Sequence, residues 1–517
     1  MDQIFARVMA GFLLCCGAAG FAQAKDFSVS TTDEVSQALN AAQGGDRIVL
    51  APGLYGVLSI RGQKDVGLGF ASPVIVTSQN AKDKAVIAKL ELVDASQLTF
   101  DGLLFDYTYS AGDKVNYQPF SVVRSRDITF TNSVFDGDVA IGTGTPADGF
   151  GTGKGLNISY SKSIGVKNNI FYNWHRAAIF HYIEDLIIKS NEVTNVRSDG
   201  FDFAAITTAL IEGNHMHDFR IAANTGDHWD MIQFWTNKTN IPSTNITIRN
   251  NFLDSGTGAG TQSIFMRNEE VDNGRMGDEM FYQNILIEGN LIRNAHLNAI
   301  VVGEARSVKI SRNTLLQSMT VAEGGKVSVP SIRVVLPATD VEISNNIFPK
   351  TPKLFAKPPA GWTITGNVEA QRDDSGGANY YGRNFVDALS YKTKQTSDLA
   401  LLPDSEWAGK SIGSPLSDFD TTPEKPMAFV THNRGAGGIL QQDFQLPAAY
   451  GPSGALDVSA ATISWSFGDG ETGAGQRVSH TYQTAGSYTV TATVKLPDME
   501  TIVCERTIVV GYKVSPK

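Results

Sequence analysis

Histidine, tryptophan and carboxylate side chains gather in one stretch of this chain, residues 175–235. Five of the eight histidines lie there, at positions 175, 181, 215, 217 and 228, and so do two of the six tryptophans, Trp229 and Trp235. Imidazole and carboxyl groups can take up and release protons, and aromatic rings stack on the apolar faces of sugar rings. This composition predicts a groove with acid–base chemistry, because an ordinary solvated face would show no preference for these residue types.

Two short segments are the strongest candidates for the centre of that groove, GDHWDMIQ (226–233) and SDGFD (198–202). Their polar candidates are Asp227, His228, Asp230, Gln233, Asp199 and Asp202. Hydrolysis of a glycosidic bond needs two carboxyl groups, whereas abstraction of a proton from carbon needs a base such as imidazole. A simpler alternative for His228 is that it caps a turn.

Further polar and aromatic candidates flank these segments. They are His175, Arg176, His181, Tyr182, Trp235 and Arg267. Arg267 can bind a substrate carboxylate, or it can pair with Glu269 or Glu270. Carboxylate oxygens are ligands for calcium, so Asp199, Asp202 and Asp230 form a candidate calcium site, and the acidic loop after Arg267 is another.

A repeat positions these residues along the chain. Each copy has alternating apolar residues, then an asparagine, then further apolar positions, as in IGVKNNIF (164–171), LIIKSNEV (186–193) and VEISNNIF (341–348). Aligned asparagines are 22 residues apart from Asn169 to Asn191 and 23 apart from Asn191 to Asn214. Period-two alternation excludes helical repeats, and a propeller blade needs about 40 residues. The pattern predicts an all-β parallel β-helix, with coils about 4.8 Å apart and the asparagines in a ladder at an internal turn.

A second strand follows the asparagine turn in each coil, beginning with AAIFHY (177–182), DGFDFA (199–204) and DMIQFW (230–235). The third residue of each is apolar and is predicted to point inward, so the fourth points outward. The predicted outward column is Phe180, Asp202, Gln233, Phe265, Val301 and Arg333. Its polar members lie beside long insertions at 215–245 and 254–284, and inserted loops are where sites are usually built.

Residues 26–375 resemble the right-handed parallel β-helix superfamily of polysaccharide lyases, mannuronan epimerases and polygalacturonase-type hydrolases. The opening AAQGGDRIVLAPGLYG (41–56) is similar to the N-terminal cap and first coil of alginate and chondroitin lyases. SDGFD partly resembles the DGFDPH-like element of mannuronan epimerases, although Phe203 and Ala204 follow it here. The resemblance implies a pectate lyase-like solenoid that cleaves an acidic, uronate-containing polysaccharide such as alginate by β-elimination.

For a uronate polymer, the C5 proton becomes acidic once the neighbouring carboxylate is neutralised. In this hypothesis His228 is the base, His181 or Tyr182 is the acid, and Arg267 and Gln233 bind the carboxylate. The full catalytic set is His228, Arg267, His181, Tyr182 and Asp230. The substrate-binding set is Asp199, Asp202, Asp227, Gln233, Trp235, His175 and Arg176. A C5-epimerase, a glycoside hydrolase and a non-catalytic polysaccharide-binding protein remain as alternatives.

The C-terminal segment carries a different pattern. ISWSFGDGE (463–471) and VSHTYQTAGSYTVTATV (478–494) resemble a polycystic-kidney-disease (PKD)-type domain, a small β-sandwich that acts as a spacer or carbohydrate-binding module. The predicted organisation is a signal peptide at 1–24, a β-helix catalytic domain at 25–375, final coils and linker at 376–427, and the PKD-type domain at 428–517.

Composition narrows the remaining classes. The formal net charge is −10 and no dense basic run occurs, so a nucleic-acid partner is not expected. Arg7, the apolar run 8–19 and the small residues Ala22 and Ala24 predict a cleaved signal peptide and a secreted or periplasmic chain without membrane insertion. Only Cys504 then remains, which excludes an internal disulfide. We further expect a monomer without an organic cofactor.

Overall fold

A computed structural model describes residues 24–510 except 256–259, 319–327, 350–357, 386–387, 389–395, 403–404, 416–426, 429–430, 435–439, 447–448, 452–453 and 498. The predicted signal peptide therefore lies outside the described residues, apart from its last position. Within the described residues, no helix combines the length and apolar character needed to cross a lipid bilayer.

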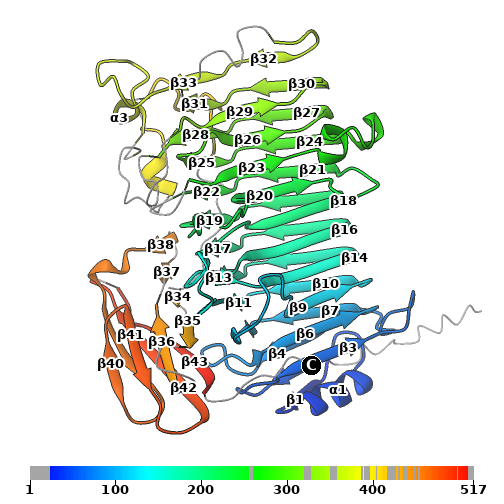
Figure 1. Cartoon of the computed structure of the whole chain (residues 1–517), viewed down its shortest axis with the longest axis vertical. Helices are drawn as coiled ribbons and strands as arrows, with labels where there is room; N and C mark the ends of the chain where they lie inside the picture. Colours follow the sequence, from blue (N-terminus) through cyan, green and yellow to red (C-terminus); the bar gives the residue numbers. More distant parts are fainter. Residues whose placement is uncertain are drawn as a thin grey trace, which may run out of the picture.

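The predicted parallel β-helix is confirmed by a stack of coils whose strands pair in parallel (Figure 1). Within the described residues, one sheet of 20 strands winds over two faces of the solenoid. Its strands are β1 (Asp26–Val29), β2 (Arg47–Leu50), β3 (Val57–Arg61), β4 (Val74–Ser78), β6 (Lys89–Val93), β7 (Ser96–Asp101), β9 (Phe120–Val123), β10 (Arg126–Thr131), β14 (Lys154–Lys167), β16 (Arg176–Lys189), β18 (Phe201–Glu212), β20 (Asp230–Trp235), β21 (Thr244–Arg249), β23 (Gln262–Met266), β24 (Tyr282–Glu288), β26 (Asn298–Val302), β27 (Ala305–Ser311), β29 (Ser331–Val334), β30 (Ala338–Ser344) and β32 (Thr363–Thr365).

A second sheet of 11 described strands forms the third face of the solenoid. Its strands are β5 (Val86–Ile87), β8 (Leu104–Asp106), β11 (Val134–Asp136), β15 (Ile170–Tyr172), β17 (Glu192–Thr194), β19 (His215–His217), β22 (Phe252–Asp254), β25 (Leu291–Asn294), β28 (Thr314–Gln317), β31 (Ile347–Pro349) and β33 (Val368–Ala370). A short antiparallel pair, β12 (Asp138–Val139) and β13 (Gly151–Thr152), extends from the coil that contains β11.

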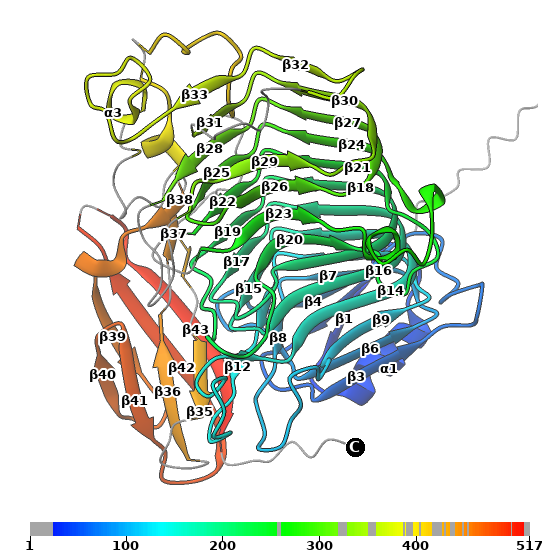
Figure 2. The same ribbon diagram turned by 45° about the horizontal axis from the view of Figure 1, so that its top comes forward.

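The long strands β14, β16 and β18 turn a corner between the first two faces. Tyr160, Tyr182 and Ala205 have φ values of 51°, 54° and 55° in the middle of these strands, and the parallel pairing resumes after them. We call the part before the corner the first face. It comprises Lys154–Ser159, Arg176–His181 and Phe201–Ala204, followed by β20, β23, β26 and β29, which run across the front of Figure 2.

The predicted asparagine ladder is present at the turn before the third face. Each Nδ2 donates to the Oδ1 of the next asparagine at 2.9–3.1 Å. The rungs are Asn169, Asn191, Asn214, Asn251, Asn290, Asn313, Asn346 and Asn367. Ser133 takes the corresponding place in the preceding coil, where its amide N–H donates to Asn169 Oδ1 at 3.0 Å. The ladder thus satisfies the buried polar groups of a turn that repeats from coil to coil.

Stacked aromatic rings fill the core between the faces. Phe105, Phe135 and Phe171 stack with centroids 4.6 Å apart in each pair, and Phe180, Phe203 and Phe234 form a second column. The N-terminal end of this core is covered by helix α1 (Thr32–Ala41), which buries Val35, Ala38 and Leu39 and begins with a capping box between Thr31 and Glu34.

The predicted alignment of the first-face strands is correct from Phe201 onward and wrong by one residue in the preceding coil. Phe201 pairs with Ala178, and Asp202 pairs with Ile179. Ile179 therefore belongs to the outward column, whereas Phe180 is buried in the core. A slip of one residue exchanges the two faces of a strand, and the apolar run from 177 to 180 gave no signal to fix its register.

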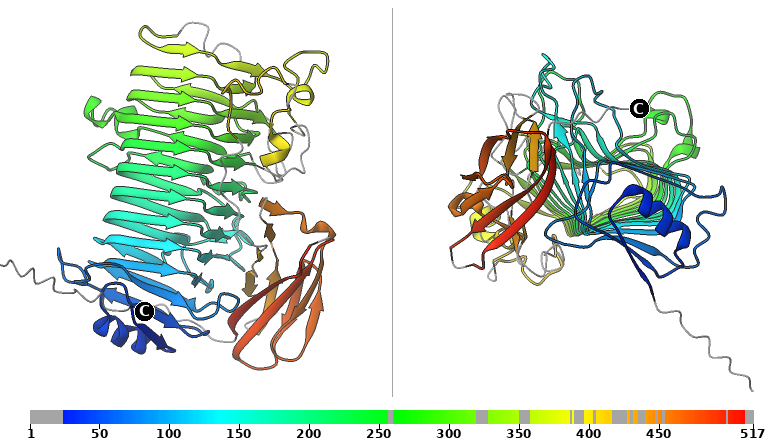
Figure 3. Two further views of the ribbon diagram at one scale, coloured as in Figure 1. Left: turned by 180° about the vertical axis from the view of Figure 1, so that it is seen from behind. Right: turned by 90° about the horizontal axis from the view of Figure 1, so that it is seen from below.

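A separate antiparallel unit follows the solenoid. Its strands are β34 (Met427–Ala428), β35 (Thr431–Arg434), β36 (Gln441–Gln445), β37 (Ala449–Gly451), β38 (Gly454–Leu456), β39 (Thr462–Ser466), β40 (Thr472–Ala474), β41 (Arg477–Thr481), β42 (Gly486–Lys495) and β43 (Ile502–Val510). Trp465 and Tyr482 are buried in its core. Figure 3 shows this unit beside the N-terminal coils, where the Glu505 amide N–H donates to the Lys82 carbonyl at 3.2 Å. The short helices are α2 (Glu269–Asp272), α3 (Tyr381–Asn384), η1 (Asp278–Met280), η2 (Thr396–Leu399) and η4 (Val458–Ala460).

Replacement of one asparagine of the ladder should lower the free energy of unfolding considerably. Asn214 accepts from the amide and side chain of Asn191 and donates to Ile188 O and Asn251 Oδ1. Asn214→Ala leaves these buried partners unpaired, so we expect urea unfolding to show a loss of about 3 kcal/mol or more. Asn284→Gly is the matched control, because Asn284 makes the same kind of contact to Asn245 on the surface and glycine adopts its left-handed φ of 57° without strain, so it should cost less than about 1 kcal/mol. Equal losses would contradict the role of the ladder.

Candidate active site

Polar residues mark the point where each strand of the first face begins. Lys154 pairs in register with Arg176, and Asp230 pairs with Gln262. Asp199 and Asn298 lie at the corresponding place in their coils, since Ala177 donates to Asp199 O and β26 begins with Asn298. Three residues further along the chain, Asp202 pairs with Gln233. Consecutive coils thus place these side chains side by side.

Arg176 lies between two of the three carboxylates. Its Nη2 is 2.9 Å from Asp199 Oδ2, and its Nη1 donates to Asp202 Oδ2 at 2.9 Å. The other oxygen of Asp199 accepts the amide N–H of Asp230 at 3.1 Å. The structure therefore brings together four of the residues that the sequence singles out. These are Arg176, Asp199, Asp202 and Asp230, which we call the carboxylate cluster.

Asp230 has one oxygen engaged and one free of hydrogen bonds. Gln262 Nε2 donates to its Oδ1 at 2.5 Å, and Asn298 Nδ2 in turn donates to Gln262 Oε1 at 2.5 Å. Oδ2 is buried without a hydrogen-bond partner. If Asp230 is protonated, Oδ2 is the oxygen that can carry and donate the proton.

The environment favours the protonated form of this cluster. Burial raises the pKa of Asp230 to about 8, and the neighbouring Asp202 charge acts in the same direction. Burial also raises the pKa of Asp199 and of Asp202, although Arg176 and Lys154 oppose the shift at Asp202. Arg176 and Lys154 thus favour the charged form of Asp202, whereas burial favours Asp230 as a proton donor at neutral pH.

Sequence reasoning missed Lys154, Gln262 and Asn298. Lys154 is the cationic neighbour of Arg176, and burial together with the Arg176 charge lowers its pKa. The signal was present in the sequence, because each of these residues begins a first-face strand. These residues lie outside the predicted outward column, which contains only the fourth position of each strand.

Unpartnered polar atoms are concentrated around the cluster. Asp202 Oδ1, Asp230 Oδ2 and Arg176 Nε are buried without hydrogen-bond partners, as are the indole N–H groups of Trp229 and Trp235. Leaving such groups unpaired costs about 1–3 kcal/mol each. Donors and acceptors that await partners in one neighbourhood are what a ligand rich in hydroxyl groups would satisfy.

Asp227 lies apart from the carboxylate cluster and anchors the loop before β20. It accepts from Arg197 Nε at 2.8 Å and from Thr225 Oγ1 at 2.6 Å, and its Oδ1 is 3.0 Å from His175 Nε2. These hydrogen bonds outweigh burial and hold the pKa of Asp227 below its usual range, while burial lowers the pKa of His175. Both residues position the loop that carries His228 and Trp229.

The other predicted residues occupy the rim of the first face. His228 is exposed, and its carbonyl oxygen accepts a hydrogen bond from Ser198 Oγ at 2.7 Å. Its charge opposes the rise that burial causes in the pKa of Asp202. His181 and Trp235 are both in register with Ala204, about 6.6 Å along the strands from the Asp202 column. Tyr182 lies at the corner, where its hydroxyl donates to Asn240 Oδ1 at 2.7 Å.

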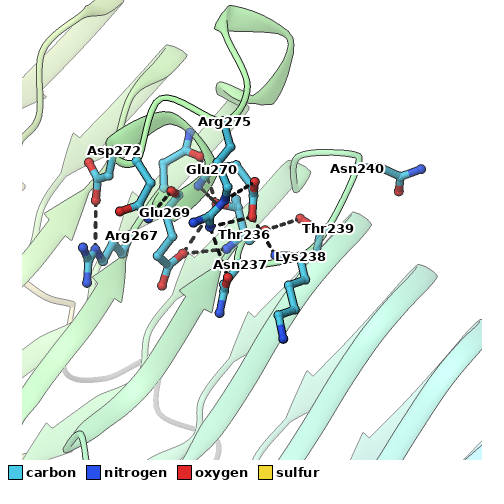
Figure 4. A network of polar contacts seen from close by, with 12 residues as sticks. Thr236, Asn237, Lys238, Thr239, Asn240, Arg267, Glu269, Glu270, Asp272 and Arg275 are labelled. Atoms are coloured by element: carbon cyan, nitrogen blue, oxygen red, sulfur yellow. Dashed lines mark hydrogen bonds and ion pairs between the residues drawn. The ribbon is translucent and has the colours of Figure 1, made fainter.

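Arg267 forms an ion pair with an acidic residue of the inserted loop. Figure 4 shows its guanidinium directed at Asp272, to which Nε donates at 2.8 Å. The expected alternative of an ion pair is thus present, but its partner is Asp272 rather than Glu269 or Glu270. Glu270 instead binds Arg275 at 2.8 Å, and Glu269 accepts from the amide of Thr236 at 2.8 Å. Glu270 and Asp272 thus pair with arginines close to them in the chain, whereas Asp278 pairs with Arg306 of β27.

The carboxylate cluster fits calcium poorly. Asp199 and Asp202 both direct an oxygen at Arg176, so a guanidinium already supplies the positive charge between them. Among the described side chains, a convergent group of possible metal ligands occurs elsewhere, at Glu192, His215 and His217. No step below depends on calcium.

Comparison with known proteins identifies the smaller unit. Residues 441–510 match the family model of the PKD domain. The PKD1 domain of the Vibrio cholerae metalloprotease PrtV is 26% identical over 17% of this chain and 99% of that domain, with a TM-score of 0.14. The chain therefore carries a PKD domain at its C-terminal end.

Several solved structures are similar to the larger unit at low sequence identity. The Dettilon tailspike protein is 11% identical over 90% of this chain and 86% of its own, with a TM-score of 0.43. The PL6 family alginate lyase AlyGC is 12% identical over 76% of this chain, with a TM-score of 0.33, and the match spans 58% of AlyGC. The DFA-IIIase of Arthrobacter chlorophenolicus A6 is 13% identical over 69% of this chain and 90% of its own, with a TM-score of 0.36.

No curated protein sequence matches. The chain is thus a parallel β-helix joined to a PKD domain.

The raised pKa of Asp230 predicts a pH-dependent stability. Between about pH 4 and 8 the folded chain holds a proton that the unfolded chain has lost, so the free energy of unfolding falls across this range and levels off above about pH 8. Asp230→Asn removes the titration, and we expect its thermal midpoint to rise by several degrees relative to wild type between pH 6 and 9. Asp227→Asn should instead be destabilised at neutral pH, with the difference shrinking below about pH 4. Parallel pH profiles for all three chains would contradict this assignment.

Proposed function

We propose that the first face binds a polysaccharide and that the Asp202–Asp230 pair hydrolyses its glycosidic bonds. The observation that carries the proposal is the combination of a carboxyl group with a pKa of about 8 and a neighbouring carboxylate held by Arg176. Asp230 donates a proton from Oδ2 to the leaving glycosidic oxygen. In one route Asp202 takes a proton from a water that attacks the anomeric carbon, and proton exchange with solvent then returns Asp202 to the carboxylate and Asp230 to the acid. In the other route Asp202 attacks the anomeric carbon and forms an ester, and a water that gives its proton to Asp230 hydrolyses this ester and restores both groups.

The surroundings suit a sugar chain. The unpartnered atoms of Arg176, Trp229 and Trp235 can bind hydroxyl groups, and the Trp235 and His181 rings can stack on pyranose faces. The first face continues past the cluster through β23, β26 and β29, so neighbouring sugar units have room along the coils. We place the reaction outside the cytoplasm, because residues 1–24 have the pattern of an export signal.

A lyase acting on an acidic, uronate-containing polysaccharide such as alginate is the second candidate. The observation that favours it is Lys154, whose pKa is lowered by burial and by Arg176 beside it in register. A lysine with a lowered pKa can act as the base at C5, and Arg176 could neutralise the substrate carboxylate. Arg176 is engaged by both Asp199 and Asp202, however, so the lyase needs one of these ion pairs to open.

The first test separates the two reactions. The purified chain is incubated with neutral polysaccharides and with alginate, polygalacturonate, glucuronan and chondroitin, with calcium and with chelator. Hydrolysis gives saturated reducing ends without ultraviolet absorbance, whereas β-elimination gives absorbance from the C4–C5 double bond. Saturated ends on any polymer support the proposal, and absorbance on a uronate polymer replaces it with the lyase.

Two substitutions then assign the groups. We expect Asp230→Asn and Asp202→Asn each to lower kcat by about 10²–10⁴-fold, because each removes a proton-transfer or nucleophilic group. The matched control is Asp185→Asn, since Asp185 is an exposed carboxylate beyond the corner on β16, the strand of Arg176, and its rate should stay within twofold. Lys154→Met should have little effect on kcat for the hydrolase and should abolish the lyase. Activity of Asp230→Asn within a few fold of wild type would refute the proposed mechanism.

A further inference from the structure

A second cluster of titratable side chains lies on the third face of the solenoid, away from the carboxylate cluster. Glu192 begins β17, and His215 and His217 begin and end β19. Glu192 pairs in register with His215, whereas His217 pairs with Thr194. Figure 1 shows β17 and β19 on the side of the solenoid that also carries α3 and the PKD domain. The proposed function makes no use of these residues.

The three side chains converge on one point. Glu192 Oε1 contacts His217 Nε2, and Glu192 Oε2 is 3.3 Å from His215 Nδ1. One ligand atom from each residue lies within 4.8 Å of those of the other two. The two imidazole rings are parallel to within 29° with centroids 4.3 Å apart, so both present a nitrogen to the same carboxylate.

The position of the cluster is unusual for charged groups. In the same register column, Val86, Leu104, Val134 and Ile170 precede Glu192, and Phe252 and Leu291 follow His215. The Glu192, His215 and His217 side chains retain only 13%, 10% and 6% of their exposure. Placing a carboxylate and two imidazoles inside an otherwise apolar column costs free energy unless a further favourable interaction holds them there.

The contacts that surround His215 and His217 are those expected of histidines that bind a metal. Asp218 Oδ2 lies 2.7 Å from Nδ1 of His217, the nitrogen that faces away from Glu192. A carboxylate on the far nitrogen of a ligating histidine fixes its tautomer and orientation in metal proteins. The Phe252 ring stacks on His215 at 4.6 Å and restricts its rotation. Both histidines are thus held with a nitrogen directed at Glu192.

We propose that Glu192, His215 and His217 bind a divalent transition metal, with zinc as the preferred ion. Two imidazole nitrogens and one carboxylate oxygen form a common zinc ligand set, whereas calcium and magnesium prefer oxygen ligands. The ligating atoms are His215 Nδ1, His217 Nε2 and a Glu192 oxygen, and a fourth ligand comes from outside this set. The metal joins two successive coils of the third face and is separate from the proposed reaction.

The test measures metal uptake by the full, tag-free chain, because a polyhistidine tag would itself bind zinc. After treatment with chelator, the chain is incubated with zinc or cobalt, freed of excess metal by gel filtration and analysed by elemental mass spectrometry. We expect one equivalent of zinc, a rise of the thermal midpoint with zinc but not with calcium, and visible absorption of four-coordinate cobalt. Less than 0.1 equivalent at micromolar zinc, or cobalt without that absorption, would overturn the proposal.

Variants assign the metal to these residues. Glu192→Gln keeps the size of the side chain and should weaken zinc binding by at least about tenfold, and His217→Gln should do the same. The control is His480→Gln in the PKD domain, where His480 Nε2 lies 2.6 Å from Asp469 Oδ2 in a pair that lacks a second histidine. Unchanged zinc uptake by Glu192→Gln and His217→Gln would refute the site. If these variants do not fold, the zinc and cobalt results on the wild-type chain decide.

Discussion

Stacking of one coil on the next is the constraint on which the whole molecule depends, and the asparagine ladder enforces it. Each rung ties its own side chain to the backbone of the preceding coil and to the side chain of the next, as Asn214 does with Ile188 and Asn251. A shift by one residue would break these bonds and also turn the phenylalanine columns out of the core. The ladder therefore fixes register, and register decides which side chains become neighbours.

The carboxylate cluster and the cluster of Glu192, His215 and His217 both follow from that register. Residues 22 to 37 positions apart in the sequence, such as Arg176, Asp199 and Asp230, meet because successive coils present the same strand position. The solenoid core is apolar, so carboxyl groups placed at the starts of the first-face strands are desolvated and retain protons that they would lose in water. The same effect operates on the third face, where Glu192, His215 and His217 are enclosed by apolar neighbours.

Much of the architecture was predictable because it repeats. Period-two alternation and asparagines 22 or 23 residues apart predicted the solenoid and the ladder, and the resemblance of segments 463–471 and 478–494 to a PKD-type domain predicted the sandwich. The residues of the carboxylate cluster were also found, because they lie in the stretch 175–235, which is rich in histidine, tryptophan and carboxylate side chains. Lys154, Gln262 and Asn298 were missed, since they lie at equivalent strand starts but outside that stretch, and Phe180 was wrongly predicted to point outward because its coil has four apolar residues in succession.

The amino-acid sequence by itself determined the fold, the asparagine ladder and the set of side chains available for chemistry, because a repeated local pattern can satisfy its backbone and core in only one way. The tertiary structure alone decided which of those side chains form a cluster, which anchor a loop and which lie on another face of the solenoid. It bound Asp227 to His175 and Arg197 as a loop anchor and paired Arg267 with Asp272. It also placed His215 and His217 on a face different from that of Asp202 and Asp230. These outcomes depend on burial and on contacts between coils, which no local spacing encodes.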